Sequence, residues 1–161
     1  MAGVLAQAAP LGPGNEAPDF EMKGSDGKTY KLSDFKGKKA VVIAWYPKAF
    51  TQGCTKECKA MAEQGDEIRK YDVAYFTASV DDAEQNKKFA ESLELDYPIL
   101  SDPTKENAKA FGVLNDRGMA NRWTFYIDKN GKITHVDKKV ATETHGKDIA
   151  AKLKELGVAP K

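Results

Sequence analysis

The sequence contains very few cysteines, since Cys54 and Cys58 are the only two in 161 residues. A scaffold held together by disulfides is therefore excluded, and a chain of this length can bury a sizeable core without one. Long apolar runs are also absent. No stretch approaches the ~18 apolar residues that a membrane-spanning helix requires, so we expect a soluble protein that does not enter a membrane.

Charge of one sign is lacking as well. The 25 Lys and Arg residues are spread among 24 Asp and Glu residues, and the formal net charge is +1. A nucleic-acid-binding stripe or a polybasic membrane patch would need an excess of positive charge in one region. Hydrophobic residues make up 41% and charged residues 30% of the chain, which is ordinary for a globular protein. The composition therefore predicts one soluble domain with no nucleic-acid or membrane partner.

The N-terminus lacks basic residues, because the first Lys or Arg is Lys23. It therefore has no basic segment of the kind that opens a secretory signal. The stretch VLAQAAP still resembles the end of such a signal, with an apolar run and an A-x-A cleavage motif. A plain flexible arm would have the same composition, so both interpretations stay open, and with them a cytoplasmic or an exported, periplasmic location. We assign residues 1–13 to a flexible N-terminal arm and residues 14–161 to a single domain.

What is present is a regular alternation of strand and helix patterns. Continuous apolar runs at residues 40–46 and 73–80 predict two strands that are buried on both faces. Between them, apolar residues at helical spacing predict a helix from residue 53 to about residue 71. Two turn signals, Ser25-Asp26-Gly27 and Asn130-Gly131, predict hairpins near the start and the end of the domain.

Further helices complete the pattern. A helix with Asp102 as its N-cap is predicted to end at Gly112. The final helix is predicted to turn Ile149, Leu153 and Leu156 toward the core. Strand–helix–strand units followed by a hairpin and a helix predict an α/β fold. We expect a central mixed β-sheet that is flanked by helices and preceded by an N-terminal β-hairpin.

Cys54 is placed where a buried strand gives way to a helix. The backbone N–H groups of a first helical turn have no intrahelical partner, and the helix dipole adds partial positive charge there. Both effects favour a thiolate over a thiol, and the thiolate is the nucleophilic form of cysteine. A reactive cysteine and a small buried hydrophobic residue are both compatible with this position.

Cys58 lies one helical turn further along the same apolar stripe, where a buried and inert side chain is expected. Residues four apart on a helix have Cβ atoms ~5–6 Å apart, whereas a disulfide needs ~3.5–4.5 Å. A permanent bond to Cys54 would therefore require the first turn of the helix to unwind. Only a transient bond after local unfolding is compatible with the pattern.

The two cysteines are also too few for a structural zinc site, which needs four ligands. His135 and His145 are the only histidines in the chain. His135 falls on a predicted strand and His145 in a polar connection before the last helix, where we expect ordinary surface or half-buried side chains. The cysteine spacing also differs from C-x-x-C, so a thioredoxin-like dithiol is not predicted. We expect no metal and no cofactor.

Pro47, Thr51 and Cys54 form a P-x-x-x-T-x-x-C motif. This motif resembles the signature of the peroxiredoxins, the AhpC/TSA family with a thioredoxin-like fold, and GCTKE resembles their Q-type, or bacterioferritin-comigratory-protein, branch. The resemblance runs from Gly14 to the C-terminus, because further segments follow in the family's order and spacing: EAPDF, DGKTYKLSDFKGKKAVV, SVD, KKFAESLELDYPILSD, AKAFGV and RWTFYIDKNGKI. Ordered agreement over this length is more specific than one short motif.

The resemblance implies a thiol-dependent peroxidase that reduces hydrogen peroxide and organic hydroperoxides. Cys54 would be the peroxidatic cysteine, whose thiolate attacks the O–O bond and becomes a sulfenic acid. Thr51 would hydrogen-bond the peroxide and could also cap the helix, while Pro47 would shield the thiolate from water. Arg122 would be the active-site arginine, with fixed donors for the charge that develops on the peroxide oxygens. A thioredoxin- or glutaredoxin-like reductant and a monomer or weak dimer are also implied.

Two departures from the family pattern concern Gln52 and Cys58. Gln52 replaces the proline that is common before Gly-Cys in the Q-type branch, which we expect to alter the stiffness of the loop more than its chemistry. Q-type members with a resolving cysteine in this helix usually have four residues between the cysteines, whereas this chain has three. Cys58 is therefore either a resolving cysteine that condenses with oxidised Cys54 after unwinding, which we favour, or a structural residue in a one-cysteine enzyme.

A binding protein is the main alternative. Sco-type copper chaperones share this fold and carry a C-x-x-x-C pair at this place, and thiolates with histidine suit copper. Their third ligand is a histidine just before a strand, where this chain has Asn121 and Arg122, and His135 lies on the following strand instead. The combination of Thr51 and Arg122 favours peroxide chemistry over copper binding. A redox-sensing or chaperone protein on the same fold is a third interpretation.

Overall fold

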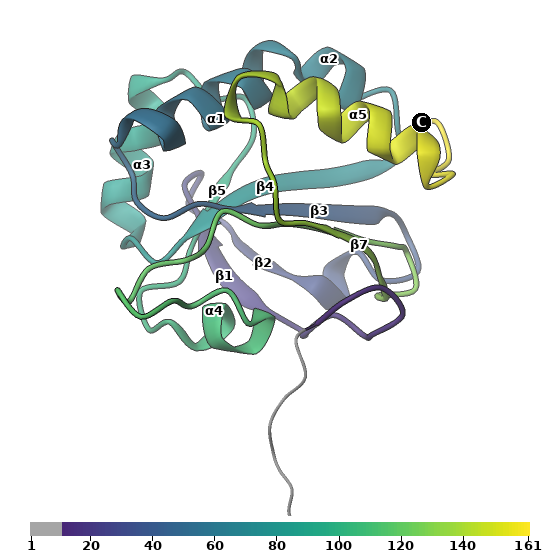
Figure 1. The fold of residues 1–161 in the computed structure, drawn as a ribbon, viewed down its shortest axis with the longest axis horizontal. Coiled ribbons are helices and arrows are strands. Elements are labelled where there is room, and N and C mark those ends of the chain that lie inside the picture. Colours follow the sequence, from purple (N-terminus) through teal and green to yellow (C-terminus); the bar gives the residue numbers. More distant parts are fainter. Residues whose placement is uncertain (1–10) are drawn as a thin grey trace, which may run out of the picture.

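The computed structural model describes residues 11–161 as helices packed around one β-sheet (Figure 1). Most of the predicted N-terminal arm, residues 1–10, lies outside the described residues. The strands are β1 (Glu21–Gly24), β2 (Thr29–Lys31), β3 (Ala40–Trp45), β4 (Val73–Ser79), β5 (Ile99–Ser101), β6 (Thr124–Ile127) and β7 (Ile133–Asp137). The helices are α1 (Gln52–Glu63), α2 (Gly65–Ile68), α3 (Ala83–Ser92), α4 (Glu106–Phe111) and α5 (His145–Glu155), with 3₁₀ turns η1 (Leu32–Asp34) and η2 (Thr142–Thr144).

In this described region, seven strands form one mixed sheet in the order β2-β1-β5-β4-β3-β6-β7. β3 lies parallel to β4 and antiparallel to β6. β1 pairs with β2 as an antiparallel hairpin, and its other edge pairs with β5. The predicted α/β fold, with a mixed sheet flanked by helices and an N-terminal β-hairpin, is confirmed.

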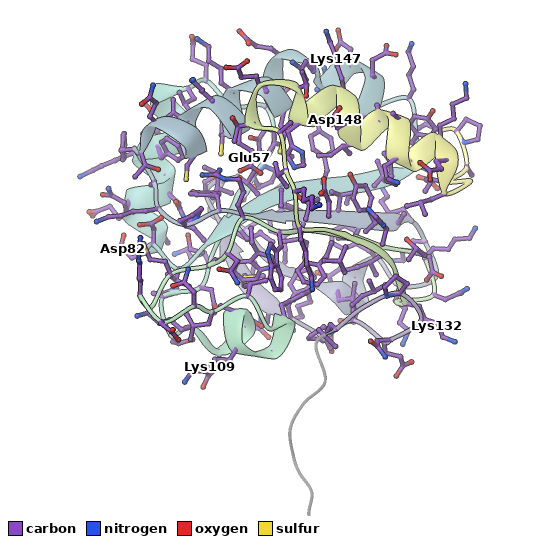
Figure 2. All side chains as sticks on the ribbon, viewed as in Figure 1. Glu57, Asp82, Lys109, Lys132, Lys147 and Asp148 are labelled. Carbon is purple, nitrogen blue, oxygen red and sulfur yellow. The ribbon has the colours of Figure 1, made fainter. Side chains whose placement is uncertain are left out.

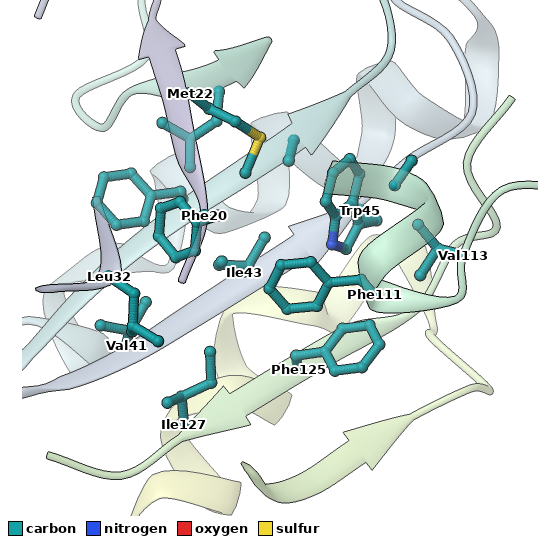
Figure 3. Packing of buried hydrophobic residues seen from close by; sticks show 14 of the residues in the cluster. Phe20, Met22, Leu32, Val41, Ile43, Trp45, Phe111, Val113, Phe125 and Ile127 are labelled. Atoms are coloured by element: carbon teal, nitrogen blue, oxygen red, sulfur yellow. The ribbon is translucent and has the colours of Figure 1, made fainter. Parts of the chain in front are cut away.

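Alternate residues of β3 face two separate cores, because the side chains of a strand alternate between its faces. Ile43 and Trp45 face a cluster that includes Phe111 of α4 and Phe125 of β6 (Figure 3). Val42 belongs to the cluster on the opposite face, which α1, α2 and α5 cover (Figure 1). All six residues of β3 are therefore buried, which explains the continuous apolar run in the sequence.

The helix predicted from residue 53 to about residue 71 is divided in two, with α1 and α2 on either side of Gln64. The side chain of Gln64 is hydrogen-bonded to η2 and to the first turn of α5. Its Nε2 donates to the Glu143 carbonyl at 3.0 Å, and its Oε1 accepts from the Lys147 N–H at 2.9 Å. The prediction of one continuous helix is therefore wrong, and the break ties the end of α1 to α5.

The helix predicted to begin at Asp102 begins at Glu106, so Asp102 is not its N-cap. An intervening turn is closed by a hydrogen bond of 2.9 Å from the Lys105 N–H to the Asp102 carbonyl. The Asp102 carboxylate nevertheless accepts a hydrogen bond of 2.7 Å from the Ala108 N–H. This N–H is in the first turn of the helix, where the backbone N–H groups have no acceptor within the helix. Gly112 ends the helix at a φ of +74°, as predicted.

The C-terminal part of the chain follows its predicted pattern. β6 and β7 pair as an antiparallel hairpin around Asn130-Gly131, and Ile149 and Leu153 of α5 are buried. Leu156 follows α5 directly and packs, partly buried, against the same cluster. None of the helices in residues 11–161 is long and apolar enough to cross a membrane.

Candidate active site

Cys54 lies in the first turn of α1, shortly after the loop that leaves β3. The residue is only 1% exposed. The N–H groups of a first turn have no intrahelical acceptor, so the start of the helix supplies partial positive charge beside the sulfur. The predicted position of Cys54 between a buried strand and a helix is confirmed.

Arg122 reaches this sulfur from the residues that lead into β6. Its Nη2 donates to Cys54 Sγ at 3.3 Å, and its Nη1 donates to Glu57 Oε1 at 2.5 Å. β6 lies next to β3 in the sheet, and the Trp45 N–H donates to the Trp123 carbonyl at 2.9 Å. The end of β3 is thereby fixed against the start of β6, and the predicted cysteine and arginine are brought together.

Thr51 and Pro47 lie in the loop between β3 and α1. Thr51 occupies the N-cap position of α1, but its hydroxyl donates to the Lys48 carbonyl at 2.7 Å, and its side chain accepts no helix N–H. The capping role that we considered for this side chain is therefore wrong. Thr51 is exposed and Pro47 is half-buried, so the threonine is open to solvent three residues before the buried Cys54.

The loop before α1 is held by side chains that the sequence patterns did not single out. The Ala49 N–H donates to Asp81 Oδ2 at 2.8 Å, and the same carboxylate accepts from the Ser79 hydroxyl at 2.8 Å. Phe50 has a φ of +64°, a conformation that residues other than glycine rarely adopt. Its ring lies 5.0 Å from the Phe89 ring, yet Phe50 is 51% exposed. An exposed aromatic side chain therefore lies in the loop that precedes Cys54.

Cys58 is fully buried one turn after Cys54, as its place on the apolar stripe predicted. Its thiol donates to Thr77 Oγ1 at 3.8 Å, and the Tyr97 hydroxyl donates to its carbonyl at 2.7 Å. Burial raises the pKa of the Cys58 thiol, so the folded helix keeps it in the unreactive thiol form. Both cysteines are free, and of the two, Cys54 is the one bonded to an arginine.

Glu57 and His145 are fully buried beside Arg122, and neither was among the predicted site residues. Figure 2 places Glu57 between α1 and the sheet. Its Oε2 lies 3.4 Å from His145 Nε2, which in turn lies 2.9 Å from Thr124 Oγ1. The expectation of a surface or half-buried His145 is wrong, because α5 begins at this residue and packs it against β6. His135 is half-buried on β7, as expected.

Burial acts on every ionisable group of this cluster. Loss of hydration raises the pKa of Glu57 to about 7, against the opposing effect of Arg122, and lowers the pKa of His145 to about 4. Desolvation also disfavours the charge on Arg122, but the neighbouring Glu57 carboxyl and Cys54 sulfur outweigh it, and the pKa of Arg122 is raised. The guanidinium therefore stays protonated, while burial favours the neutral forms of Glu57 and His145.

No group of three or more His, Cys, Asp or Glu side chains in the described part of the chain is arranged to hold a metal ion. The copper-binding alternative needs a histidine near the two cysteines. His145 instead contacts Glu57 and Thr124, and the ring of His135 lies 5.6 Å from the ring of Tyr126. That alternative therefore has no third ligand within residues 11–161.

The fold and a buried thiol bonded to an arginine are those of a thiol-dependent oxidoreductase. Comparison with known proteins gives the family: the AhpC/TSA family matches residues 13–136. Peroxiredoxin Bcp from Escherichia coli K12 is 34% identical over 153 residues, which cover 91% of this chain and 97% of that relative. The chain belongs to the AhpC/TSA family and is a peroxiredoxin, a thiol peroxidase.

Solved structures agree with this assignment. Peroxidoxin BcpB from Mycobacterium tuberculosis is 31% identical with a TM-score of 0.82, and the match covers 90% of this chain and 97% of that one. The bacterioferritin comigratory protein of Xanthomonas campestris is 25% identical with a TM-score of 0.80, over 89% of this chain and 98% of that one. The resemblance to the Q-type branch and the thioredoxin-like fold are confirmed.

Proposed function

We propose that Cys54 is the peroxidatic cysteine of this peroxiredoxin and that it reduces hydrogen peroxide and organic hydroperoxides. The contact of 3.3 Å between Arg122 Nη2 and Cys54 Sγ carries the proposal, because it places a fixed cation beside a thiol at a helix start. Cys58 instead contacts the uncharged Thr77, and its thiol pKa is raised by burial. The first cysteine is therefore the one prepared for nucleophilic attack.

The reaction needs an attacking thiolate and a stabilised leaving oxygen. The Cys54 thiolate attacks one peroxide oxygen, and the S–O bond forms as the O–O bond breaks. The second oxygen leaves with the electron pair as hydroxide or alkoxide and takes up a proton to become water or an alcohol. This two-electron oxidation leaves Cys54 as a sulfenic acid. The donors of Arg122 stabilise the charge that develops on the two oxygens.

Thr51 supports the orientation of the peroxide in this proposal. Its hydroxyl proton is donated to the Lys48 carbonyl, so its oxygen is left to accept the O–H of a hydroperoxide. Such a bond would align the O–O axis with the sulfur for in-line attack. Pro47, half-buried in the same loop, would limit the access of water to the thiolate.

An apolar surface beside the site supports organic hydroperoxides as substrates. Phe50 is 51% exposed and packs against Phe89, so its ring offers apolar area to an alkyl tail. The Xanthomonas campestris relative is described as reducing alkyl peroxides. We extend that substrate class to this chain.

Cys58 is the resolving cysteine in this proposal. Its thiol would condense with the Cys54 sulfenic acid, which forms an S–S bond and releases water. Because Cβ atoms four residues apart on a helix are ~5–6 Å apart and a disulfide needs ~3.5–4.5 Å, the start of α1 must unwind first. A thioredoxin- or glutaredoxin-like dithiol would then reduce the disulfide by exchange.

Intact-mass measurement after one equivalent of peroxide separates the roles of the two cysteines. The wild-type protein should lose two hydrogens, Cys58→Ser should gain one oxygen that reacts with a sulfenic-acid trap, and Cys54→Ser should stay unchanged and lack peroxidase activity. Full activity in Cys54→Ser would refute the peroxidatic role. A trappable sulfenic acid in the wild type, without loss of hydrogens, would show a one-cysteine cycle.

A further inference from the structure

Glu57 and His145 form a buried pair behind Arg122 that the proposed peroxide chemistry does not use. Glu57 Oε1 accepts from Arg122 Nη1 at 2.5 Å, and Glu57 Oε2 lies 3.4 Å from His145 Nε2. Both members of the pair are 0% exposed. A continuous line of contacts therefore runs from the Cys54 sulfur, through the guanidinium and the carboxyl, to the imidazole.

The hydrogen-bonding capacity of this pair is not filled. Within residues 11–161, neither Glu57 Oε2 nor His145 Nδ1 has a hydrogen-bond partner. His145 Nε2 lies 2.9 Å from the Thr124 hydroxyl, which can either donate to it or accept from it. Because an unpaired polar atom in the interior is costly, a proton held between Glu57 Oε2 and His145 Nε2 would stabilise this arrangement.

Charged and titratable groups face the pair from several elements: Arg122 before β6, Asp137 of β7, Asp148 of α5, Cys58 of α1, and Tyr97 before β5. Cys54 lies beyond them, bonded to Arg122. Burial is the largest influence on both members. It raises the pKa of Glu57 to about 7 and lowers the pKa of His145 to about 4. Near neutral pH, the Glu57 carboxyl is therefore the group that gains and loses a proton.

Contacts between α1 and α5 fix this geometry. Gly146 lies so close to α1 that an added Cβ would be 2.8 Å from the Ala60 carbonyl oxygen. The side chain of Gln64 accepts from the Lys147 N–H at 2.9 Å. The start of α5 is thereby locked to the helix that carries the reactive cysteine, which keeps the His145 imidazole within reach of the carboxyl.

We infer that Glu57 and His145 hold one exchangeable proton behind Arg122, and that His145 is a positioning residue for the peroxide reaction. The inference rests on the proposed role of Cys54. With the proton in place, the guanidinium faces a neutral pair, and its charge is directed at the thiolate and the peroxide oxygens. When the proton leaves, the Glu57 carboxylate and the Cys54 thiolate both attract the positive charge of Arg122. This competition is strong, because charges interact more strongly in the protein interior than in water. Loss of the proton therefore weakens the support that the arginine gives to the reaction.

The proton can be followed directly, because the chain has only two histidines. In nitrogen-15 NMR of the reduced wild-type protein, His145 should be a neutral imidazole whose signals shift in one step near pH 7, as Glu57 ionises. His135, half-buried on β7, is the internal control and should not follow that step. Glu57→Gln should abolish it. The inference would be overturned if His145 took up a proton over the same pH range as His135. It would also be overturned if the His145 signals still shifted near pH 7 in Glu57→Gln.

Single-turnover reduction of hydrogen peroxide tests the positioning role. His145→Gln offers Glu57 an amide N–H, which stabilises the carboxylate, but no ring nitrogen to accept the carboxyl proton, so Glu57 should ionise at a lower pH. Between the lowered pKa of Glu57 and pH 7 the rate constant should then be smaller than that of the wild type, by up to about tenfold for each unit by which this pKa is lowered. It should converge with the wild type below the lowered pKa and at alkaline pH. His135→Gln should follow the wild type throughout. The positioning role of His145 would be overturned if His145→Gln and His135→Gln had equal rate constants at every pH. It would also be overturned if the rate constant of His145→Gln were reduced by the same factor at every pH.

The two measurements separate this inference from the proposed function. The NMR step does not depend on catalysis, so an inactive wild-type protein that shows the step would refute the peroxidase proposal and the positioning role but support the proton pair. An active wild-type protein with no step at His145 would refute the proton pair and the positioning role of His145, but not the peroxidase proposal. Circular dichroism of each variant establishes that it is folded before rates are compared.

Discussion

The guanidinium of Arg122 bonds to two partners at once, the sulfur of Cys54 and the carboxyl of Glu57. The planar guanidinium holds its N–H donors in fixed directions toward both partners. The ammonium group of a lysine, at the end of a flexible side chain, would not do so. One cation therefore contacts both the Cys54 sulfur and a buried acid. At the scale of single residues, the geometry of this side chain matters as much as its charge.

Arg122→Lys should slow the second-order reaction of the reduced enzyme with hydrogen peroxide by about 10²–10³-fold, the usual effect of losing one preorganised donor. The charge is kept, but the directional contacts are lost. Stopped-flow measurement of peroxide consumption gives the rate. Arg117→Lys alters an exposed arginine and should react like the wild type. If Arg122→Lys reacted as fast as that control, the arginine would have no role in positioning the peroxide.

Thr51→Val removes the hydroxyl while nearly keeping the shape of the side chain. The rate with hydrogen peroxide should fall on the order of 10²-fold, because the peroxide loses the bond that aligns it. Thr51→Ser keeps the hydroxyl and should retain most of the activity. The same stopped-flow assay compares the two variants, and equally fast reactions in both would contradict the proposed bond to the peroxide.

At the scale of elements, α1 links the two thiols to the buried acid. Glu57 lies between Cys54 and Cys58 in the sequence, so unwinding that brings the two sulfurs together also moves the carboxyl that Arg122 holds. Formation of the disulfide would therefore move the Glu57 carboxyl away from Arg122. In the proposed cycle, the condensation that follows the oxidation of Cys54 is therefore coupled to the structure of one helix.

Hydrogen exchange should reveal this coupling. After oxidation with peroxide, amides at the start of α1 should exchange faster than in the reduced protein, while β3, buried on both faces, should stay protected. Cys58→Ser treated in the same way cannot close the disulfide and should keep the protection of the reduced helix. Mass spectrometry of peptides from α1 and β3 measures both. Unchanged protection of α1 in a protein that has lost two hydrogens would show that the bond closes without unwinding.

Much of the element pattern could be predicted from the sequence. The runs at residues 40–46 and 73–80 became β3 and β4, because burial on both faces leaves a continuous apolar signal. The break at Gln64 could not be predicted, since it depends on bonds to the start of α5. The start of α4 was misplaced for a related reason: Asp102 carries capping chemistry but acts from outside the helix. Local patterns do not record such contacts.

At the scale of the whole molecule, the sheet brings together parts of the site that lie far apart in the chain. Arg122 could be predicted beside Cys54 only because both belong to segments that resemble one family. The Glu57–His145 pair was missed, because acidic residues on helices are mostly exposed and the segment before His145 is polar. One signal was present: Glu57 lies three residues after Cys54 and four before Met61, which is the spacing of one helix face.

Burial of this pair also makes the stability of the whole fold depend on pH, with opposite signs for its two members. The pKa of Glu57 rises from 4.5 to about 7 on folding. The unfolded chain then releases a proton that the folded protein keeps, so stability is lost as the pH rises from 4.5 to 7. The pKa of His145 falls from 6.5 to about 4 on folding. The unfolded chain then binds a proton that the folded protein does not, so stability is lost as the pH falls from 6.5 to 4.

In the wild type the two effects largely cancel between those limits, so single substitutions should expose them. In Glu57→Gln only His145 remains, and the free energy of unfolding should rise by about 3 kcal/mol from pH 4 to pH 6.5, at ~1.4 kcal/mol per unit. In His145→Gln only Glu57 remains, and the free energy of unfolding should fall as the pH rises from 4.5, at ~1.4 kcal/mol per unit, until the pH reaches the lowered pKa that Glu57 has in this variant. Urea denaturation followed by circular dichroism measures the free energy of unfolding of each protein as a function of pH. The wild type is the reference, because all other ionisable groups titrate in the same way in the three proteins. Profiles parallel to the wild type in both variants would contradict the burial of an ionisable pair, because only groups whose pKa changes on folding give stability a slope with pH.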